Sequence, residues 1–369
     1  MNNLFNLEKE IKIKPFRNIF TAEISIKNLP FRSFGKGFNK EEALISAYGE
    51  MYERILLKNY FEDYAIEILY HDQEVKSFDI KKFYDLDIEK EDLIDFNSNS
   101  LEILSIPFGD TFFPINLIQN LFASNGMAFH KSYEEAYYNA KCEIVERYVK
   151  IKVLKEKIPL EKIKHRYNDE NIQIYRATLD KYPVMAASFI KGNKIILSFG
   201  CDIDEERAID KAYLELLQTE FKEFGEFGET DEFELEKHFV NLSGNVPKKV
   251  ISGNVKYKSI TTLPKLNEYI RRVDYKNYTA VHIIVPNLSE VYPIDDLIYN
   301  NKNFGKFVRV NILNKKDIEY TPYELGSLCG FIFKKPFYYD DYIKNKKIPE
   351  FDEKYINLIN FNKELNNEI

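Results

Sequence analysis

Residues 41–54 read EEALISAYGEMYER, and the same skeleton of acidic, alanine and arginine positions returns twice along the chain. In the second copy each position lies 93 residues further on, which pairs Glu50 with Glu143, Glu53 with Glu146 and Arg54 with Arg147. A weaker third copy begins at Glu206, at an offset of 165 residues, and contains Glu215 and Gln218. Helices that repeat a pair of carboxylates can bring several acidic side chains to one centre. Such a centre suits Mg²⁺ and the phosphates that it carries.

The composition limits the class of protein. The 369 residues are 44% hydrophobic, which is enough for a core. The chain has no apolar run of membrane-spanning length, and its first residues lack the basic start and apolar stretch of a secretory signal. Three distant cysteines, Cys142, Cys201 and Cys329, indicate reduced, buried thiols in a cytoplasmic protein. The net charge of −7 argues against binding along a nucleic-acid backbone.

Periodicity and capping residues predict the elements. Helices are expected over about 40–60, with Asn39 as N-cap, and over about 133–154, with Ser132 as N-cap. A third helix is expected to begin after an N-cap at Asp202 or Asp204 and to end at about residue 224. Glu135 completes a capping box with Ser132. Strands are expected over 19–26, 101–108, 111–116, 184–190, 194–199 and 279–285. A further short strand is expected to run into residues 33–37. This alternation predicts an α+β fold in which internally pseudo-repeated antiparallel sheets pack with the repeat helices.

Other stretches carry weaker patterns. The first fifteen residues are polar and mixed, which indicates a loose lead-in. Residues 70–100 resemble an insertion with short helices. The acidic stretch Glu223–Glu236 is expected to form a solvated loop. No linker rich in glycine, serine or proline divides the chain, so we expect one compact unit.

The repeated glutamates allow two interpretations. A Glu-x-x-Glu-Arg helix is common, and Glu50 and Arg54 could form a solvated i,i+4 pair that contributes about 0.2–0.5 kcal/mol. However, bulky apolar residues flank both glutamate pairs and leave no clear polar face. Carboxylates in such surroundings need partners, and a hard cation supplies partners to several at once. We therefore predict that the two pairs converge on one site.

A Gly-Lys-Gly segment at 35–37 precedes the first repeat helix. The two glycines would let the backbone approach a phosphate, and Lys36 would place a positive charge on it. Alone, such a segment is more often a turn. The chain contains no Walker A, HExxH, GxSxG or GxGxxG motif, which disfavours a P-loop NTPase, a zinc hydrolase, a serine hydrolase and a dinucleotide-binding fold. Cys142 is interpreted as a packing residue.

Taken in order, these motifs resemble the YcaO superfamily over about residues 15–310. The resemblance is carried by Ser33-x-Gly35-Lys36-Gly37, Ser46-Ala47-x-x-Glu50-x-x-Glu53-Arg54, Ser124-Asn125-Gly126-Met127 and Glu143-x-x-Glu146-Arg147-Tyr148-Val149-Lys150. Later segments, including Ile283-Ile284-Val285-Pro286 and Tyr292-Pro293, are similar to the bacterial branch of that superfamily.

The resemblance implies a YcaO-like fold with a site for ATP and Mg²⁺ at the centre of the repeats. It implies an N-terminal lead over 1–14, an ATP-binding domain over 15–334 and a C-terminal tail over 335–369. Metal and polyphosphate would be held by Glu50, Glu53, Glu143 and Glu146. The nucleotide would also contact Ser46, Glu135 and Arg147, and Lys36 lies in the family's Gly-Lys-Gly segment. No catalytic residue is assigned.

Members of the family phosphorylate the oxygen of a peptide amide, so that a thiol, hydroxyl or sulfide can replace it or cyclise onto it. The bacterial branch is instead associated with a radical methylthiotransferase that modifies an aspartate of small-subunit ribosomal protein twelve. The resemblance therefore implies a cytoplasmic accessory to that modification. Its partners would be a ribosomal protein or peptide substrate and the methylthiotransferase, and a homodimer is left open.

Two other functions stay open at this point. One is an enzyme that forms azolines or thioamides in a ribosomally made peptide. The other is a scaffold that has lost nucleotide turnover, because Ala128, Lys131 and Glu220 depart from the family pattern.

Overall fold

The computed structural model describes residues 7–57 except Pro30, 124–177, 183–221 and most of 246–285. It also describes Phe5 and short segments at 105–108, 111–114, 229–230, 288–289, 319–320 and 337–338, with Asn357 and Phe361. The predicted insertion at 70–100, Cys329 and most of the predicted tail lie outside the described residues. None of the helices in the described parts combines the length and hydropathy that a membrane crossing requires.

Three long helices and sixteen strands make up the described structure, with one short 3₁₀ helix at Val250–Ser252. The helices are α1 (Lys40–Leu56), α6 (Tyr133–Lys155) and α7 (Glu205–Phe221). The strands of the three larger sheets are β1 (Lys9–Phe16), β2 (Ile19–Ile26), β3 (Arg32–Gly37), β6 (Met127–His130), β7 (Glu161–Ile163), β8 (Ile172–Arg176), β9 (Val184–Lys191), β10 (Lys194–Cys201), β13 (Tyr269–Tyr275) and β14 (Tyr278–Ile284). The remaining short strands are β4 (Ser105–Phe108), β5 (Thr111–Pro114), β11 (Glu229–Thr230), β12 (Val246–Pro247), β15 (Glu319–Tyr320) and β16 (Phe337–Tyr338).

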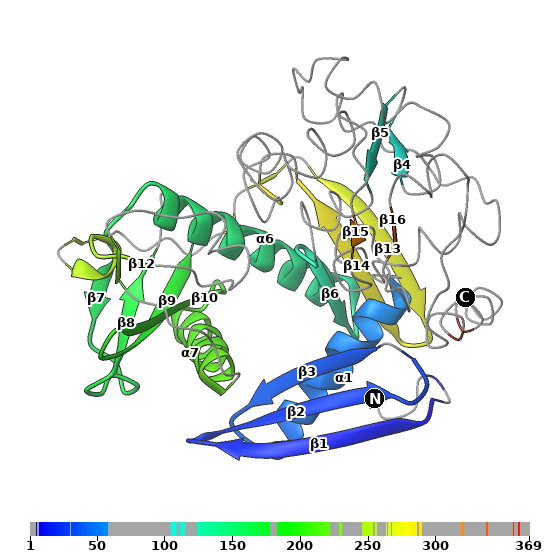
Figure 1. Ribbon diagram of the computed structural model, residues 1–369, viewed down its shortest axis with the longest axis horizontal. Helices are drawn as coiled ribbons and strands as arrows, with labels where there is room; N and C mark the ends of the chain where they lie inside the picture. Colours follow the sequence, from blue (N-terminus) through cyan, green and yellow to red (C-terminus); the bar gives the residue numbers. More distant parts are fainter. Residues whose placement is uncertain are drawn as a thin grey trace.

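The larger sheets are antiparallel and share one plan. Their strand orders are β1-β2-β3, β13-β14-β6 and β10-β9-β8-β7. In each, the strand at one edge leads directly into a long helix: β3 into α1, β6 into α6 and β10 into α7 (Figure 1). The predicted α+β fold of pseudo-repeated antiparallel sheets packed with helices is confirmed.

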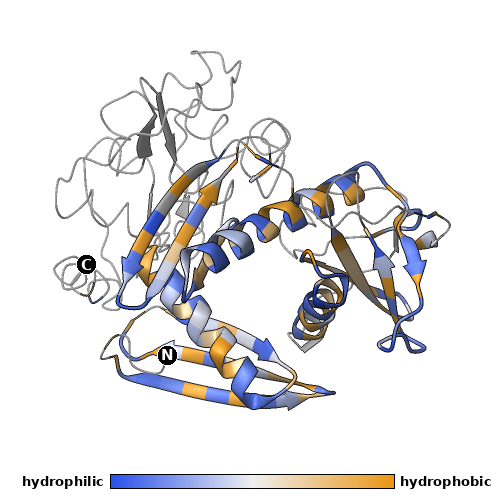
Figure 2. Cartoon of the chain, turned by 180° about the vertical axis from the view of Figure 1, so that it is seen from behind, coloured by the Kyte–Doolittle hydropathy of each residue, from blue (hydrophilic) through white to orange (hydrophobic). Residues whose placement is uncertain are grey.

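Residues 9–16 correct one expectation, because they form strand β1 rather than a loose lead-in. The two-residue turn at Arg17 and Asn18 joins β1 to β2, and Arg17 has a positive φ of 50°. The strand lies at the edge of its sheet and is mostly exposed. Its apolar and charged residues alternate, but neither set is buried (Figure 2). That alternation, Glu10-Ile11-Lys12-Ile13-Lys14, was the signal for a strand.

Most other predicted elements are confirmed within a few residues. Helix α1 ends at Leu56, while residues 58–60 of the prediction lie outside the described part. Helix α7 ends at Phe221 rather than about 224. Within the predicted acidic loop, Glu229–Thr230 pairs in parallel with β12. Strands β6, β7, β8 and β13 were not predicted.

Strands β9 and β10 of the four-stranded sheet are buried on both faces. Ala186, Leu197 and Phe199 pack with α6 in one hydrophobic cluster, while Ala187, Phe189 and Ile196 pack with α7 in another. Strands covered on both faces have apolar residues in succession, as β9 and β10 do. Helix α6 also packs against β6 and β14 through its N-terminal half, so this helix joins two of the three sheets.

Candidate functional site

The three helices begin in the same way. Asn39, Ser132 and Asp204 cap them, and these caps are separated by the same offsets of 93 and 165 residues as the sequence repeats. In each cap a side-chain oxygen accepts the backbone N–H three residues later, at 2.9 Å, 3.2 Å and 3.0 Å respectively. The caps predicted at Asn39 and Ser132 are confirmed, and Asp204 rather than Asp202 caps α7.

The contact between strand and helix is also repeated. A Cβ atom on Gly35 would lie 2.1 Å from the carbonyl oxygen of Ala43, and one on Gly200 would lie 2.4 Å from that of Ala208. Glycine at these positions allows the backbones to approach closely. The equivalent residue of the second unit is Ala128, 93 positions after Gly35. The second unit therefore has a methyl group at the position where the other two units have glycine.

The three units form a closed ring. Helix α1 contacts β6 of the second unit, α6 contacts β10 of the third, and α7 contacts β3 of the first (Figure 1). Each helix is therefore held by its own sheet and by the leading strand of the next unit. Helical positions that are equivalent in the repeats consequently face a common centre.

An open cavity of about 520 Å³ occupies this centre. Equivalent positions of the repeats line it in sets: Glu50, Glu143 and Glu215; Glu53, Glu146 and Gln218; Ser46, Asn139 and Lys211; Arg54 and Arg147. The two glutamate pairs of the first repeats, 93 residues apart, do converge in one site, as the sequence predicted.

Seven of the eight residues singled out from the sequence line this cavity, namely Lys36, Ser46, Glu50, Glu53, Glu143, Glu146 and Arg147. Glu135 is the exception. It lies in the first turn of α6 with 58% of its side chain exposed, accepts the Ser132 hydroxyl at 3.1 Å and lies 3.6 Å from His130 Nδ1. Its contact with the cavity is therefore indirect, through His130, which is a lining residue.

Two of the carboxylates have strongly perturbed acidity. Burial raises the pKa of Glu53 to about 8; Arg54 opposes this shift, while Glu143 and Glu50 add to it. Burial also raises the pKa of Glu146 to about 7, with a further increase from Glu143 and opposition from Arg147. Removal from water disfavours the charged form, and neighbouring carboxylates disfavour it further. A cation placed between these groups would reverse both effects.

The arginines pair within their own helices. Arg147 donates to Glu143 at 2.8 Å, an i,i+4 contact, whereas Arg54 Nε lies 3.6 Å from Glu53 rather than beside Glu50 as we expected. Glu50 instead accepts the backbone N–H of Phe34 at 3.3 Å, which draws its carboxylate toward β3.

The third unit is neutralised differently. Lys36 forms an ion pair with Glu215 and donates to the side chain of Gln218 at 2.9 Å. Lys36 belongs to β3, so these contacts close the ring between the first unit and the third. The residues equivalent to Lys36 are Phe129 and Cys201, neither of which is a cation.

The charges of the cavity are therefore uneven. In each of the first two units, two carboxylates are accompanied by one arginine. Such a unit has one surplus negative charge only when both carboxylates are ionised, and the raised pKa values of Glu53 and Glu146 favour their protonated forms when no cation is bound. In the third unit, the single carboxylate of Glu215 meets Lys36, and Gln218 is uncharged. The surplus of carboxylates over cations lies on the side formed by α1 and α6.

A polar wall faces this acidic side. Lys211 contacts Asp202 at 2.9 Å and Asn139 at 3.5 Å, and the Asn139 amide lies 2.9 Å from His130 Nε2. Asp202 keeps a lowered pKa, because Lys211 and several hydrogen bonds outweigh the opposing effect of burial. The thiols of Cys142 and Cys201, both free and buried, also belong to this wall.

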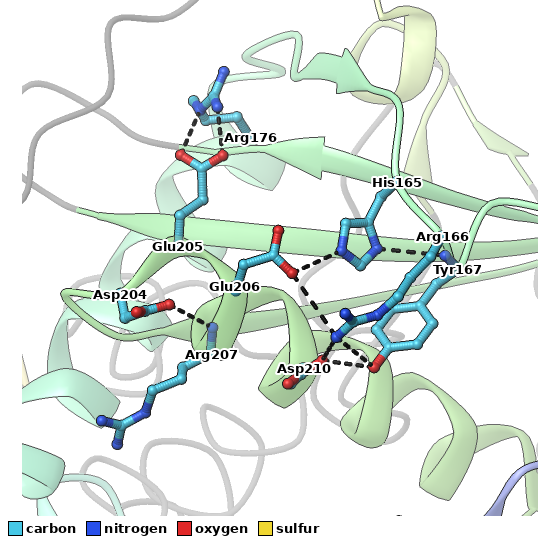
Figure 3. A network of polar contacts seen from close by, with 9 residues as sticks. All are labelled: His165, Arg166, Tyr167, Arg176, Asp204, Glu205, Glu206, Arg207 and Asp210. Carbon is cyan, nitrogen blue, oxygen red and sulfur yellow. Dashed lines mark hydrogen bonds and ion pairs between the residues drawn. The ribbon is translucent and has the colours of Figure 1, made fainter.

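The far side of α7 is fixed by a separate network (Figure 3). Arg176 binds Glu205 at 2.5 Å, and the Tyr167 hydroxyl donates to Asp210 at 2.6 Å. His165 lies 3.1 Å from Glu206, the residue that begins the third copy of the repeat. Glu206 therefore anchors the helix to the segment before β8, and does not line the cavity.

Carboxylates alone do not form a metal cage here. Within the described parts of the chain, no three His, Cys, Asp or Glu side chains are arranged to hold one metal ion. A metal ion bound in this cavity would need further ligands from water or from a bound molecule. The donor set of buried carboxylates, which outnumber the cations, suits a hard divalent cation under that condition.

Sequence reasoning missed Asn139, Lys211 and His130 as cavity residues. The first two could have been found, because they occupy the positions of Ser46 in the second and third copies. His130 has no such signal, since the residues equivalent to it, Gly37 and Asp202, do not line the cavity.

Comparisons with known proteins show which family this chain resembles. The family model described as YcaO cyclodehydratase, ATP- and Mg²⁺-binding, matches residues 34–239. An uncharacterized protein of Haemophilus influenzae is 27% identical over 384 residues, which cover 82% of this chain and 65% of that protein. The Escherichia coli protein named ribosomal protein S12 methylthiotransferase accessory factor YcaO is 26% identical over 423 residues, which cover 93% of this chain and 72% of that protein.

Among solved structures, a heterocyclase in complex with substrate and cofactor is 15% identical, with a TM-score of 0.49 over 79% of this chain and 52% of that one. The chain spans about two thirds of the length of the curated relatives that it matches. The family model covers more than half of the chain and includes all three repeat helices. The chain belongs to the YcaO family.

Proposed function

We propose that this protein binds ATP with Mg²⁺ in the central cavity and serves as an accessory to β-methylthiolation of small-subunit ribosomal protein twelve. The observation that carries the nucleotide part is the convergence of Glu50, Glu53, Glu143 and Glu146 on one side of the cavity, where carboxylates outnumber cations. The family model supports ATP and Mg²⁺. The name of the Escherichia coli relative supports the accessory role.

Mg²⁺ fits this donor set better than a metal that requires a complete protein cage. It binds one or two carboxylates and takes its other ligands from water and substrate phosphates. That habit agrees with a site in which no three acidic side chains of the described chain form a cage. When bound, Mg²⁺ would neutralise the phosphates and the carboxylates together.

The remaining residues have roles that follow from their positions. Arg147, held by Glu143, would contact the polyphosphate, and the hydroxyl of Ser46 would donate a hydrogen bond to the nucleotide. Lys36 would have to share its charge with Glu215. Glu135 would act on the nucleotide through His130. The cavity volume of about 520 Å³ lies within the range of small-molecule pockets.

A second candidate is an enzyme that forms azolines or thioamides, and the cyclodehydratase in the description of the family model favours it. In this second case the oxygen of a peptide amide would attack the γ-phosphorus in line, with ADP as the leaving group. The residues that orient the phosphates would accelerate this step by holding the two oxygens in position. The reduced thiols of the core support a cytoplasmic location.

The test is ADP release by the purified protein with each candidate acceptor. We expect stimulation by the methylthiotransferase, the ribosomal protein or both, and no stimulation by a small precursor peptide rich in Cys, Ser and Thr. The Glu143→Gln variant is the control for site-specific turnover. Stimulation by the precursor peptide alone would replace the accessory role with the second candidate. Absence of ATP binding in calorimetry would leave a non-catalytic scaffold.

A further inference from the structure

The sheet β1-β2-β3 has a face whose side chains form rows that begin at the cavity. The register places Lys14 opposite Thr21 and Thr21 opposite Lys36. The neighbouring row contains Lys12, Glu23 and Phe34. Because side chains alternate along a strand, both rows lie on the same face. The opposite face carries Gly35 and packs against α1.

A small hollow of about 60 Å³ lies on this face, beside the C-terminal end of α7. Its lining includes Lys12, Lys14, Thr21, Phe34 and Gln218. Phe34 and Gln218 also line the central cavity. The two hollows therefore adjoin along β3, and the face forms a surface that leads from the outer strand to the cavity.

The outer end of this surface is positively charged. Lys12, Lys14 and Glu10 are exposed on this face of β1, which leaves one net positive charge there, and Glu23 lies 3.8 Å from Arg32. At the inner end, carboxylates outnumber cations on the side of the cavity formed by α1 and α6. A carboxylate on an approaching molecule is therefore attracted to the lysines of β1 rather than to the carboxylate-rich side of the cavity, which gives the surface a direction.

We propose that this face, defined by Lys12, Lys14, Thr21 and Phe34, docks an acidic segment of the polypeptide substrate beside its reacting amide. The inference rests on the proposed function, because it assumes that the cavity acts on a polypeptide. Lys14 and Lys36 are separated by two strand spacings, or about 10 Å. An extended chain covers that distance in about three residues. The preferred Asp or Glu is therefore about three to five positions from the reacting amide.

The experiment uses two fluorescein-labelled peptides of twelve residues, one of alternating glycine and glutamate and one of alternating glycine and glutamine. Binding is followed by fluorescence anisotropy with the full-length protein, with and without Mg·ATP. The test variant is Lys12→Glu/Lys14→Glu. The matched control is Lys191→Glu/Lys194→Glu, which changes two exposed lysines that face each other across the β9–β10 hairpin.

We expect the wild-type protein to prefer the glutamate peptide, and the test variant to bind it about tenfold more weakly, because two favourable contacts become repulsive. Raised salt should diminish the preference. The control variant should bind as the wild type does. Equal losses in both variants would overturn the proposal, because they would reflect net charge alone.

Two further readouts separate this proposal from others. Mg·ATP affinity should be unchanged in the test variant, and a loss there would assign the lysines to the nucleotide. A changed oligomeric state, measured by light scattering, would assign the face to a second copy of the chain. Either outcome overturns the docking of an acidic segment. Failure of the wild type to bind Mg·ATP would instead refute the proposed function, while leaving the peptide comparison measurable.

Discussion

The first two strand–helix units and the third are built on one plan but differ in charge. Units β3–α1 and β6–α6 each present two glutamates and an arginine to the cavity, whereas β10–α7 presents Glu215, Gln218 and no arginine. Lys36 neutralises the third unit from the neighbouring strand. The difference shows how a repeated architecture can give an asymmetric site. The first two units have carboxylates that an external cation would neutralise. In the third unit, the carboxylate of Glu215 is already paired with Lys36.

The largest expected effect compares equivalent glutamates. Glu143→Gln should abolish the thermal protection that Mg·ATP gives, which amounts to about 2.7 kcal/mol for a ligand at 100 times its Kd. Glu215→Gln should retain most of that protection, because Lys36 already balances its charge. Unfolding of each variant with and without Mg·ATP measures the difference. Equal losses in both variants would mean that the three units contribute alike.

The next comparison concerns the close contacts of strand and helix. Gly35→Ala and Gly200→Ala should each lower the free energy of unfolding by about 1–3 kcal/mol, since the added Cβ meets backbone atoms within 2.4 Å. Ala128→Gly, which gives the second unit the same residue, should relieve no clash and change stability less. Denaturant titration measures all three. A tolerated alanine at Gly35 would show that α1 can move away from β3.

The pH dependence of the ligand-free protein tests the buried carboxylates. The pKa of Glu53 is about 8 in the folded protein and near the ordinary value of about 4.5 after unfolding. Between these values the folded state keeps a proton that the unfolded state has released. Stability therefore falls as the pH rises from about 4.5 to about 8.

Glu53→Gln gives the first unit the amide that the third unit has at Gln218, and should remove most of the fall that Glu53 causes. Glu146, with a pKa of about 7, contributes in the same direction over a narrower range. Unfolding free energies measured at several pH values, without Mg²⁺, provide the check. An unchanged slope in the variant would show that Glu53 is already ionised without a ligand.

The smallest expected effects concern the helix caps. Asn39→Ala, Ser132→Ala and Asp204→Ala should each destabilise the protein by about 1 kcal/mol, the usual loss when a capping oxygen is removed. Because the three caps are equivalent, their effects should be similar if the units resemble each other in stability. A much larger loss at Asp204, again by denaturant titration, would show that the third unit depends on its cap more than the others.

The sequence predicted the repeat helices, their caps and the meeting of Glu53 with Glu146, because these depend on local patterns and on a constant offset. It did not predict β6, which has four residues and is paired with β14 about 150 residues away. Such pairing has no local signal. The Glu50–Arg54 pair failed for a related reason, since the backbone of β3 offers Glu50 a partner that helical spacing cannot reveal.

The contacts of Lys36 with Glu215 and Gln218 also affect how the protein is made. Lys36 and Gln218 are 182 positions apart in the chain. Their contact can therefore form only after α7 has been synthesised and has docked on β3. Contacts of such long range slow folding, because a large loop must close before they contribute. The sheet of the second unit is completed later still, because β6 pairs with β14, which follows α7 in the chain. The central cavity is therefore completed at a late stage of folding. Nucleotide binding would consequently indicate that a newly made chain has finished folding.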